Sequence, residues 1–189
     1  MLDAAFEVLV DSGYEAATML AVAQRAGASK ETLYSWFGSK EGLLAALIRR
    51  EAEQASAAVE RALAGASDPR RTLVSFARGL LTLLLGERSL ALNRAALASP
   101  ELARALLAHG RHTTGPIVER YLARLAADNV IGCGRSSTQF ELLYGLIVRD
   151  SQIRALLGET PLSPRQITTR SHEAVAAFFT LTAEPAAAP

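Results

Sequence analysis

Apolar residues recur every three or four positions along most of the chain, which is the period of a helix with one buried face. Capping residues, glycines and prolines divide this pattern, as where Asp68 is followed at once by Pro69. No stretch alternates like a half-buried strand. We therefore expect an all-α fold of about nine helices, the seventh kinked or restarted at Gly115–Pro116. The expected helices span residues 1–12, 18–26, 29–37, 39–63, 69–85, 89–98, 100–125, 137–157 (capped by Ser136 or Ser137) and 164–180.

These elements suggest two domains, one over residues 1–45 and one over residues 46–184. The helix that begins at Ser39 has no proline or glycine after Gly42, so we expect it to belong to both halves. Residues 65–68 are expected to be a break, and residues 184–189 a disordered end.

Composition supports a folded helical protein but does not by itself indicate a nucleic-acid partner. Half of the 189 residues are hydrophobic, 21% are charged and 6% are aromatic, which allows a large core and favours helix over sheet. The net charge is only +1, and the first 46 residues hold three basic against six acidic side chains. Charge alone therefore argues against DNA binding, although helix N-termini and a few placed side chains can still hold phosphates.

Other classes of site find little support. No apolar run is long enough to span a membrane, and the single Cys133 suits a reducing compartment, so we expect a cytoplasmic protein. There is no nucleophile elbow, phosphate-binding glycine loop or evident carboxylate pair, and we expect neither enzymatic activity nor a cofactor. His109 and His112 have metal-ligand spacing on a helix but lack a supporting third ligand, so no metal site is expected.

The most informative stretch runs from Thr18 to Leu44. Thr18 can cap a short helix that Gly27 ends, and Ser29 can cap a second one that ends at Gly38. Two helices of about two turns joined by a glycine-containing turn form a helix-turn-helix, which lays its second helix in a DNA major groove. Phe6 and Tyr14 are expected to pack in the core of this unit.

This stretch resembles the DNA-binding signature of the tetracycline-repressor (TetR) family. The resemblance implies an all-helical homodimer that represses transcription and releases double-stranded DNA when a small-molecule effector binds its C-terminal domain. It names neither the operator nor the effector. The residues that carry it are Gly13-Tyr14, Thr18, Val22-Ala23, Ala26-Gly27, Ser29, Thr32-Leu33-Tyr34, Phe37, Ser39-Lys40-Glu41 and Leu43-Leu44.

The resemblance also implies which side chains meet DNA. Lys30 can reach a phosphate or a guanine edge, and Thr32 a phosphate or a thymine methyl group. The first short helix departs from the family, because its exposed side is expected to hold apolar residues 19–21, which leaves Gln24 and Arg25 to contact phosphates. The expected DNA-binding residues are Thr18, Lys30, Glu31, Thr32, Tyr34, Ser35, Trp36 and Lys40.

The larger domain supplies candidates for an effector pocket. Its helices offer apolar lining with a few hydrogen-bonding groups, which suits a mostly apolar or aromatic compound that is neutral or has one polar head. Asn93, in an apolar helix, either faces this ligand or bonds a neighbouring helix. The expected lining residues are Phe76, Leu80, Leu83, Leu84, Asn93, Leu106, His109, Tyr121, Phe140 and Tyr144.

The helix over residues 137–157 is apolar on two sides, so one side asks for a second partner unless both are buried within the chain. With the last helix it resembles the helix pair that forms a four-helix dimer interface in the family. Asp150 beside Arg149 is either an ion pair or part of that interface. The expected interface residues are Leu142, Gly145, Leu146, Arg149, Ile153, His172, Val175 and Phe179.

The sequence thus favours a ligand-responsive regulator that binds a near-palindromic operator as a homodimer, and the resemblance implies that it is a repressor. Two alternatives remain open. One is a helical ligand carrier or enzyme that has kept a vestigial helix-turn-helix, and the other is a DNA-binding dimer that answers to a protein partner. A salt-dependent shift with duplex DNA separates the regulator from the ligand carrier or enzyme. A pocket in the larger domain separates the ligand carrier or enzyme from the dimer that answers to a protein partner.

Overall fold

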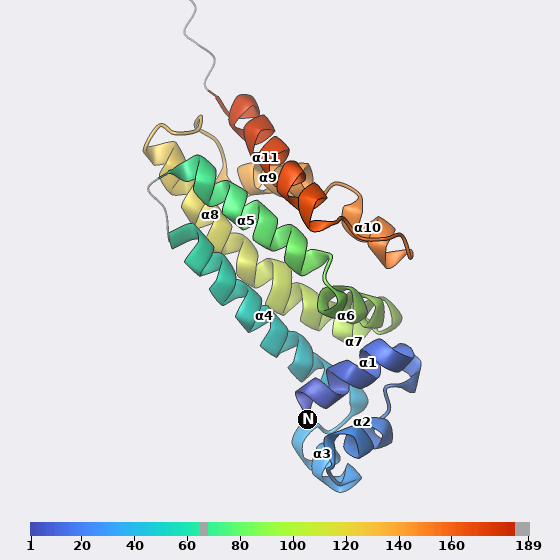
Figure 1. Ribbon diagram of the computed structural model, residues 1–189. Coiled ribbons are helices and arrows are strands. Elements are labelled where there is room, and N and C mark those ends of the chain that lie inside the picture. The colour runs from blue at the N-terminus through green and yellow to red at the C-terminus, as the bar shows by residue number, and fades with distance from the viewer. Residues whose placement is uncertain (65–67, 184–189) are drawn as a thin grey trace, which may run out of the picture. The chain divides into compact units, whose positions relative to one another are not determined.

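The computed structural model describes residues 1–64 and 68–183, and within these ranges every regular element is helical (Figure 1), which confirms the all-α prediction. The expected break at residues 65–67 and tail at residues 184–189 lie outside the described residues. The helices are α1 (Leu2–Ala16), α2 (Met19–Ala26), α3 (Lys30–Phe37), α4 (Lys40–Ala64), α5 (Pro69–Leu84), α6 (Glu87–Ala98), α7 (Pro100–Leu106), the π-helical turn η1 (Leu107–Arg111), α8 (His112–Ala127), α9 (Ser136–Val148), α10 (Ser151–Leu156) and α11 (Pro164–Leu181).

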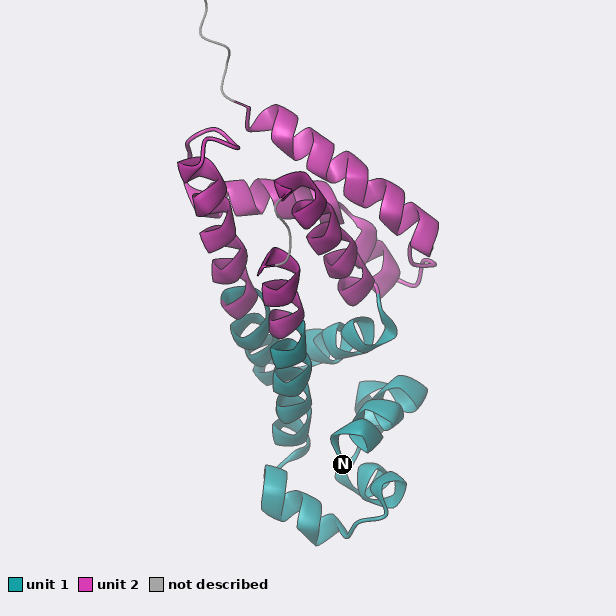
Figure 2. Cartoon of the chain, turned by 60° about the vertical axis from the view of Figure 1, so that its left-hand side comes forward, with its two compact units in different colours: residues 1–55, 86–112 teal, residues 56–85, 113–189 magenta. Residues whose placement is uncertain are grey.

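The chain forms two compact units (Figure 2). The first comprises Met1–Ala55 and Gly86–His112, and the second comprises Ser56–Leu85 and Thr113–Pro189. The segment expected to bind DNA, residues 1–45, lies wholly in the first unit, which also includes α6 and α7. The helix α4 contributes residues to both units, as the absence of a breaker after Gly42 predicted.

The first unit is built on a core shared by its short and long helices. Within it α1 packs on α2 and on α6, and α2 packs on α3. Leu33 of α3, Leu47 of α4 and Leu102 of α7 have no exposed surface and belong to this core. Burying such a leucine side chain contributes roughly 1.5–3 kcal/mol, so these contacts hold helices too short to be stable alone.

The second unit places α11 against both α5 and α9. Phe178 and Ala174 of α11, Leu73 of α5 and Leu143 of α9 are fully buried. A hydroxyl pair 3.1 Å apart, Ser56 and Thr114, joins the last turns of α4 to α8.

Local capping chemistry sets most helix boundaries where the sequence predicted them. The side chains of Thr18, Ser29 and Ser39 accept hydrogen bonds from backbone N–H groups three residues on, at 3.0–3.2 Å. Asp68 caps α5, and α11 opens with a reciprocal capping box between Ser163 and residue 166. Gly27 adopts the left-handed conformation at the end of α2, which any side chain would disfavour.

Two boundaries differ from the prediction, and they raise the number of α-helices among the described residues to eleven. The expected helix 137–157 is broken: Arg149 has φ +48°, which ends α9, and Asp150 precedes α10. Neither Ser136 nor Ser137 caps α9, because the N-cap position is Arg135 and makes no side-chain cap.

The second difference concerns the expected kink at Gly115–Pro116. Pro116 lies inside α8, and the irregular turn is η1, which ends four residues before Gly115. Proline cannot donate to the carbonyl four residues back, and a π-helical turn just before it is one way to accommodate such a defect. Gly115 instead makes room for Phe140, whose ring would lie 3.2 Å from an added Cβ.

Gly42 has a packing requirement that predicts an effect on stability. A Cβ at this position would overlap the backbone carbonyl of Phe37 at the end of α3. We therefore expect Gly42→Ala to destabilise the protein by roughly 1–3 kcal/mol, measured by urea unfolding followed by circular dichroism. Gly79, in the middle of α5 with open space around it, is the matched control. Gly79→Ala should stabilise by about 0.5–1 kcal/mol, and equal effects of both changes would contradict this account.

Candidate nucleic-acid interface

The helix α3 presents a polar and aromatic surface because only Leu33 and the half-buried Phe37 pack on the core. Leu33 is fully buried, whereas Lys30, Glu31, Ser35 and the aromatic Tyr34 and Trp36 are exposed. Phe37 is half-buried and lies edge-on to the Trp36 ring, with centroids 6.3 Å apart. The residues that the sequence placed on the exposed side of this helix are thus brought together on one element.

The N-terminus of α3 is held in place by hydroxyl groups. The Ser29 hydroxyl accepts from the Thr32 backbone N–H at 3.1 Å and lies 3.0 Å from the Thr32 hydroxyl. The carboxylate of Glu31 accepts a hydrogen bond from its own backbone N–H and another from Ser29, which lower its pKa. Thr32 is half-buried, and its hydroxyl already has the Ser29 hydroxyl as a hydrogen-bond partner. Lys30 lies at the start of the helix, and its ammonium is 5.5 Å from the centre of the exposed Tyr34 ring.

The first short helix, α2, supplies fewer charges than the sequence suggested. Arg25 donates to Glu7 at 3.1 Å and to Asp11 at 3.0 Å, so its charge is compensated by α1. These two carboxylates raise the pKa of Arg25. Met19 was expected on the exposed side but is buried in the core, whereas Leu20 is 51% exposed as predicted. The described surface of α2 is therefore less cationic and partly apolar.

Thr18 and Lys40, the other two candidates, both make contacts within the unit. Thr18 caps α2 through its hydroxyl. The ammonium of Lys40 lies 3.8 Å from the centre of the Tyr14 ring and donates to the carbonyl of Glu15 at 3.4 Å. The sequence gave Tyr14 only a packing role, but the structure places its hydroxyl 3.1 Å from Glu41. Partial burial is the main cause that raises the pKa of this phenol, so it remains a donor at neutral pH.

The residues predicted to line an effector pocket fall into both units. Asn93, Leu106 and His109 belong to the first unit, and the other members of the set belong to the second. Asn93 donates to the carbonyl of Ser89 one turn back in its own helix, which neither of its two expected roles included. Leu83 is exposed, whereas Phe76, Leu80, Tyr121 and Phe140 are buried and Leu84 and Tyr144 are half-buried. The rings of Phe140 and Tyr144 meet edge to face, with centroids 6.0 Å apart.

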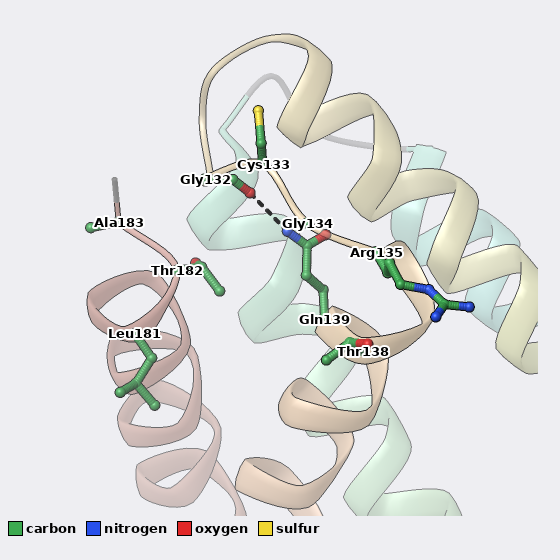
Figure 3. Close-up of a pocket in the computed structure, with 9 residues that line it drawn as sticks. All are labelled: Gly132, Cys133, Gly134, Arg135, Thr138, Gln139, Leu181, Thr182 and Ala183. Atoms are coloured by element: carbon green, nitrogen blue, oxygen red, sulfur yellow. Dashed lines mark hydrogen bonds between the residues drawn. The ribbon is translucent and has the colours of Figure 1, made fainter. Parts of the chain in front are cut away.

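A hollow lies elsewhere, at one end of the second unit (Figure 3). Gln139 of α9 lies beneath it and donates to the carbonyl of Gly132 at 2.8 Å, which fixes the loop before α9. Its other amide atom, Oε1, is enclosed without a partner. None of the predicted effector residues lines this hollow, whose walls are Gly132, Cys133, Gly134, Arg135, Thr138, Gln139, Leu181, Thr182 and Ala183.

The surface predicted for dimer contacts is only partly available. Gly145, Arg149, Ile153 and His172 are exposed, and Leu142 and Leu146 are half-buried. Val175 and Phe179 face inward instead, because α11 uses them to pack within its own unit. The guanidinium of Arg70 covers the Phe179 ring at 4.1 Å. Asp150 pairs with Arg154 at 3.7 Å rather than with Arg149. Leu157, which the sequence did not single out, is 80% exposed.

The described residues contain no cluster of three side chains able to hold a metal ion, and His109 falls in η1 while His112 begins α8. Over the same part of the chain, no helix combines the length and apolar character of a membrane span.

Two models of known protein families match the N-terminal and C-terminal parts of the chain. Residues 1–47 match the model of bacterial regulatory proteins of the tetR family, and residues 71–181 match the C-terminal domain of AefR-like transcriptional repressors. A segment of 108 residues, 57% of the chain, is 35% identical to the transcriptional repressor KstR of Mycolicibacterium smegmatis and covers 48% of that protein. The chain spans between a third and a half of the length of the curated relatives it matches.

Solved structures show the same fold over nearly the whole chain. A TetR transcriptional regulator from Agrobacterium tumefaciens is 34% identical, with a TM-score of 0.75 over 95% of this chain and 91% of that one. The flavonoid-responsive regulator FrrA is 27% identical, with a TM-score of 0.74 over 98% of this chain and 96% of that one. With a helix-turn-helix at its start and a C-terminal match over more than half of its length, the chain belongs to the tetR family of bacterial transcriptional regulators.

Proposed function

We propose that this regulator is a repressor that binds a near-palindromic duplex as a homodimer through α3. It releases the DNA when a small, mostly apolar compound binds to the protein. The observation that carries the proposal is the short helix α3, capped by Ser29 and anchored by the buried Leu33, with its polar and aromatic side chains exposed. Such a helix can enter the major groove without rearranging. The repressor KstR among its relatives supports the direction of regulation.

Recognition by this face would rely on hydrogen bonds and surface contact more than on charge. Arg25 is neutralised by two carboxylates, and Lys30 is the cation of α3. Lys30 can reach a guanine edge or a phosphate, the Thr32 methyl group can meet thymine, and Tyr34 can press against the sugar–phosphate backbone. Trp36, 68% exposed, can do the same while donating through its indole N–H.

Replacing residues of α3 should separate affinity from sequence preference. We expect Tyr34→Ala to weaken binding to all duplexes alike, because backbone contacts carry no sequence information. Lys30→Ala and Thr32→Ala should also relax base preference at particular positions, each lost base contact costing about 1–3 kcal/mol. Fluorescence anisotropy with an operator and single-base variants measures both effects. Glu53→Ala, at an exposed position of α4, is the control.

Unchanged binding of all three α3 variants at moderate salt would defeat the assignment of α3 as the recognition helix. Failure of the parent protein to bind any duplex would instead favour the ligand carrier or enzyme with a vestigial helix-turn-helix. The excess of acidic over basic residues in residues 1–46 and the exposed Leu20 are the observations that keep that second candidate.

Release requires that an effector prefer one conformation of the first unit over another. The contacts of α6 support a route for it. Arg88 of α6 stacks on the Phe6 ring of α1 at 4.0 Å and pairs with Glu51 of α4 at 3.1 Å. Arg50, next to Glu51, pairs with Asp3 of α1 at 2.9 Å. A displacement of α6 would therefore act on α1 and α4 together, and these two helices precede and follow the α2–α3 pair in the chain.

The predicted pocket residues that belong to the second unit remain our proposal for the effector site, and the likeness to a flavonoid-responsive regulator supports an aromatic compound. We expect a flavonoid to raise the dissociation constant for DNA about tenfold or more, within the usual range of allosteric coupling. Arg88→Ala should leave flavonoid binding, measured by calorimetry, as in the parent but reduce this release. The exposed Arg104→Ala is the control. A saturated fatty acid that releases DNA where flavonoids do not would correct the effector class, and equal release by Arg88→Ala would contradict the route.

The dimer is proposed to form through the exposed side of α9 and α10. Gly145 allows close backbone approach, and the apolar Ile153 and Leu157 are 52% and 80% exposed. A near-palindromic operator requires the dimer to present two recognition helices about 34–36 Å apart, one turn of DNA.

Charge placed on this surface should disrupt the dimer without unfolding the chain, because the side chains of Ile153 and Leu157 both lie outside the core. We expect Ile153→Arg combined with Leu157→Arg to weaken dimerisation about tenfold or more in sedimentation velocity at micromolar concentration. Leu97→Arg, which alters an equally exposed leucine of α6, should leave the mass unchanged. A parent protein that stays monomeric with and without DNA would rule the interface out.

A further inference from the structure

Glu31 is the acidic residue of α3, and it lies in the first turn of the helix. A helix-turn-helix brings the N-terminal residues of its second helix to the base edges, between phosphates that repel a carboxylate. An exposed acidic side chain at this place therefore costs affinity unless it meets a hydrogen-bond donor on a base. The alternative is that Glu31 only stabilises the positive end of the helix dipole.

The carboxylate of Glu31 is held at the N-terminal end of α3. It accepts hydrogen bonds from its own backbone N–H and from Ser29, the residue that caps the helix. The first of these bonds is the main cause that lowers the pKa of Glu31, so the group is ionised at neutral pH and can only accept hydrogen bonds. A carboxylate has about four lone-pair sites, so these two bonds leave room for a donor from outside the protein.

Among the four bases, cytosine presents the edge that suits a carboxylate. In the major groove guanine shows the acceptors O6 and N7, and thymine shows the acceptor O4, all of which repel a carboxylate. Adenine has a donor at N6, but its N7 acceptor lies beside that group and repels the second carboxylate oxygen. Cytosine presents the donor N4 without an acceptor of its own in the groove, so a carboxylate can bond it without this repulsion.

Lys30, the neighbouring cation, offsets part of the repulsion between Glu31 and the phosphates. Its charge also helps to lower the pKa of the carboxylate. The ammonium of Lys30 lies 5.5 Å from the centre of the Tyr34 ring, one turn further along α3. Consecutive side chains on a helix do not face each other, so the two residues reach different positions. This arrangement favours a half-site in which Lys30 bonds a guanine and Glu31 bonds a cytosine of another base pair.

We infer that Glu31 is a specificity-determining residue, whose carboxylate accepts a hydrogen bond from the N4 amino group of one cytosine in each half-site. The inference rests on the proposed DNA-binding function and gives one residue of that interface a defined task. Glu31 acts by selection against the other bases as well as by attraction, because a carboxylate that finds no donor is left facing acceptors and phosphates.

Base replacement combined with variants of Glu31 tests this task. Each base pair of the bound half-site is replaced in turn, and affinity is measured by fluorescence anisotropy. The parent should have one position at which replacing cytosine lowers affinity about fivefold or more. Glu31→Ala should lose this preference and bind unrelated duplexes more tightly than the parent, because a repulsive charge is gone. Glu53→Ala, which removes an exposed carboxylate from α4 in the same unit, should keep the parent's preference.

Glu31→Gln gives the most specific result. Its amide has the same length as the carboxylate but can bond N6 and N7 of adenine together, so the preferred base at that position should change from cytosine to adenine. This variant also keeps the test available if Glu31→Ala fails to fold, which circular dichroism shows. If Glu31 only stabilised the start of α3, both variants would instead weaken binding to all duplexes by the same factor, and that result would overturn the inference.

The same measurements keep this inference distinct from the proposed function. A parent that binds a preferred duplex, together with a Glu31→Gln variant that has the same preference at every position, would overturn the role of Glu31 and leave the proposed function in place. A parent that binds no duplex at moderate salt would overturn both.

Discussion

The complete burial of Leu33 is the constraint on which the proposed recognition surface, the exposed side of α3, depends. A helix of eight residues is far below the length of about 12–15 residues at which isolated helices become even marginally stable. What stabilises α3 is its place on the core of the first unit, to which α1, α2, α4 and α7 also contribute. Because Leu33 and the half-buried Phe37 anchor it there, the other positions of α3 are free to carry polar and aromatic residues.

The same unit shows how a DNA reader can form with little positive charge. Its acidic residues are not spread at random, since Glu7 and Asp11 engage Arg25 and Asp3 engages Arg50. Ion pairs of this exposed kind contribute little stability, about 0–1 kcal/mol each. Their larger effect is to take cationic side chains out of the pool that can meet phosphates. Affinity then depends more on how well α3 fits the groove.

Sequence reasoning succeeded where the cause of a feature is local. The caps by Thr18, Ser29 and Asp68 and the stop at Gly27 follow from hydrogen bonding and backbone conformation within a few residues, and all were predicted. The break between α9 and α10 was missed because it has no glycine or proline. Arg149 adopts a positive φ there, and the only local hint was the pair Asp150–Ser151, which resembles a helix start.

Features that depend on packing between distant segments could not be predicted in the same way. Periodicity gave α11 an apolar face but could not say that Val175 and Phe179 would be used within the chain, under α5 and Arg70. It placed Met19 on the wrong side of a helix whose apolar residues nearly surround it. The contacts of Tyr14 with Lys40, Glu41 and Ser99 join residues up to 85 positions apart, and no spacing rule brings them together.

Recovery of bound sequences from random duplex DNA tests the central claim most directly, namely that α3 reads DNA from a twofold-symmetric pair of chains. The account predicts enrichment of a near-palindrome whose half-sites are centred about one helical turn apart. It also predicts that this enrichment disappears for a protein carrying Lys30→Ala, Thr32→Ala and Tyr34→Ala together. Recovery of no preferred sequence at moderate salt, or the same palindrome from the triple variant, would contradict it.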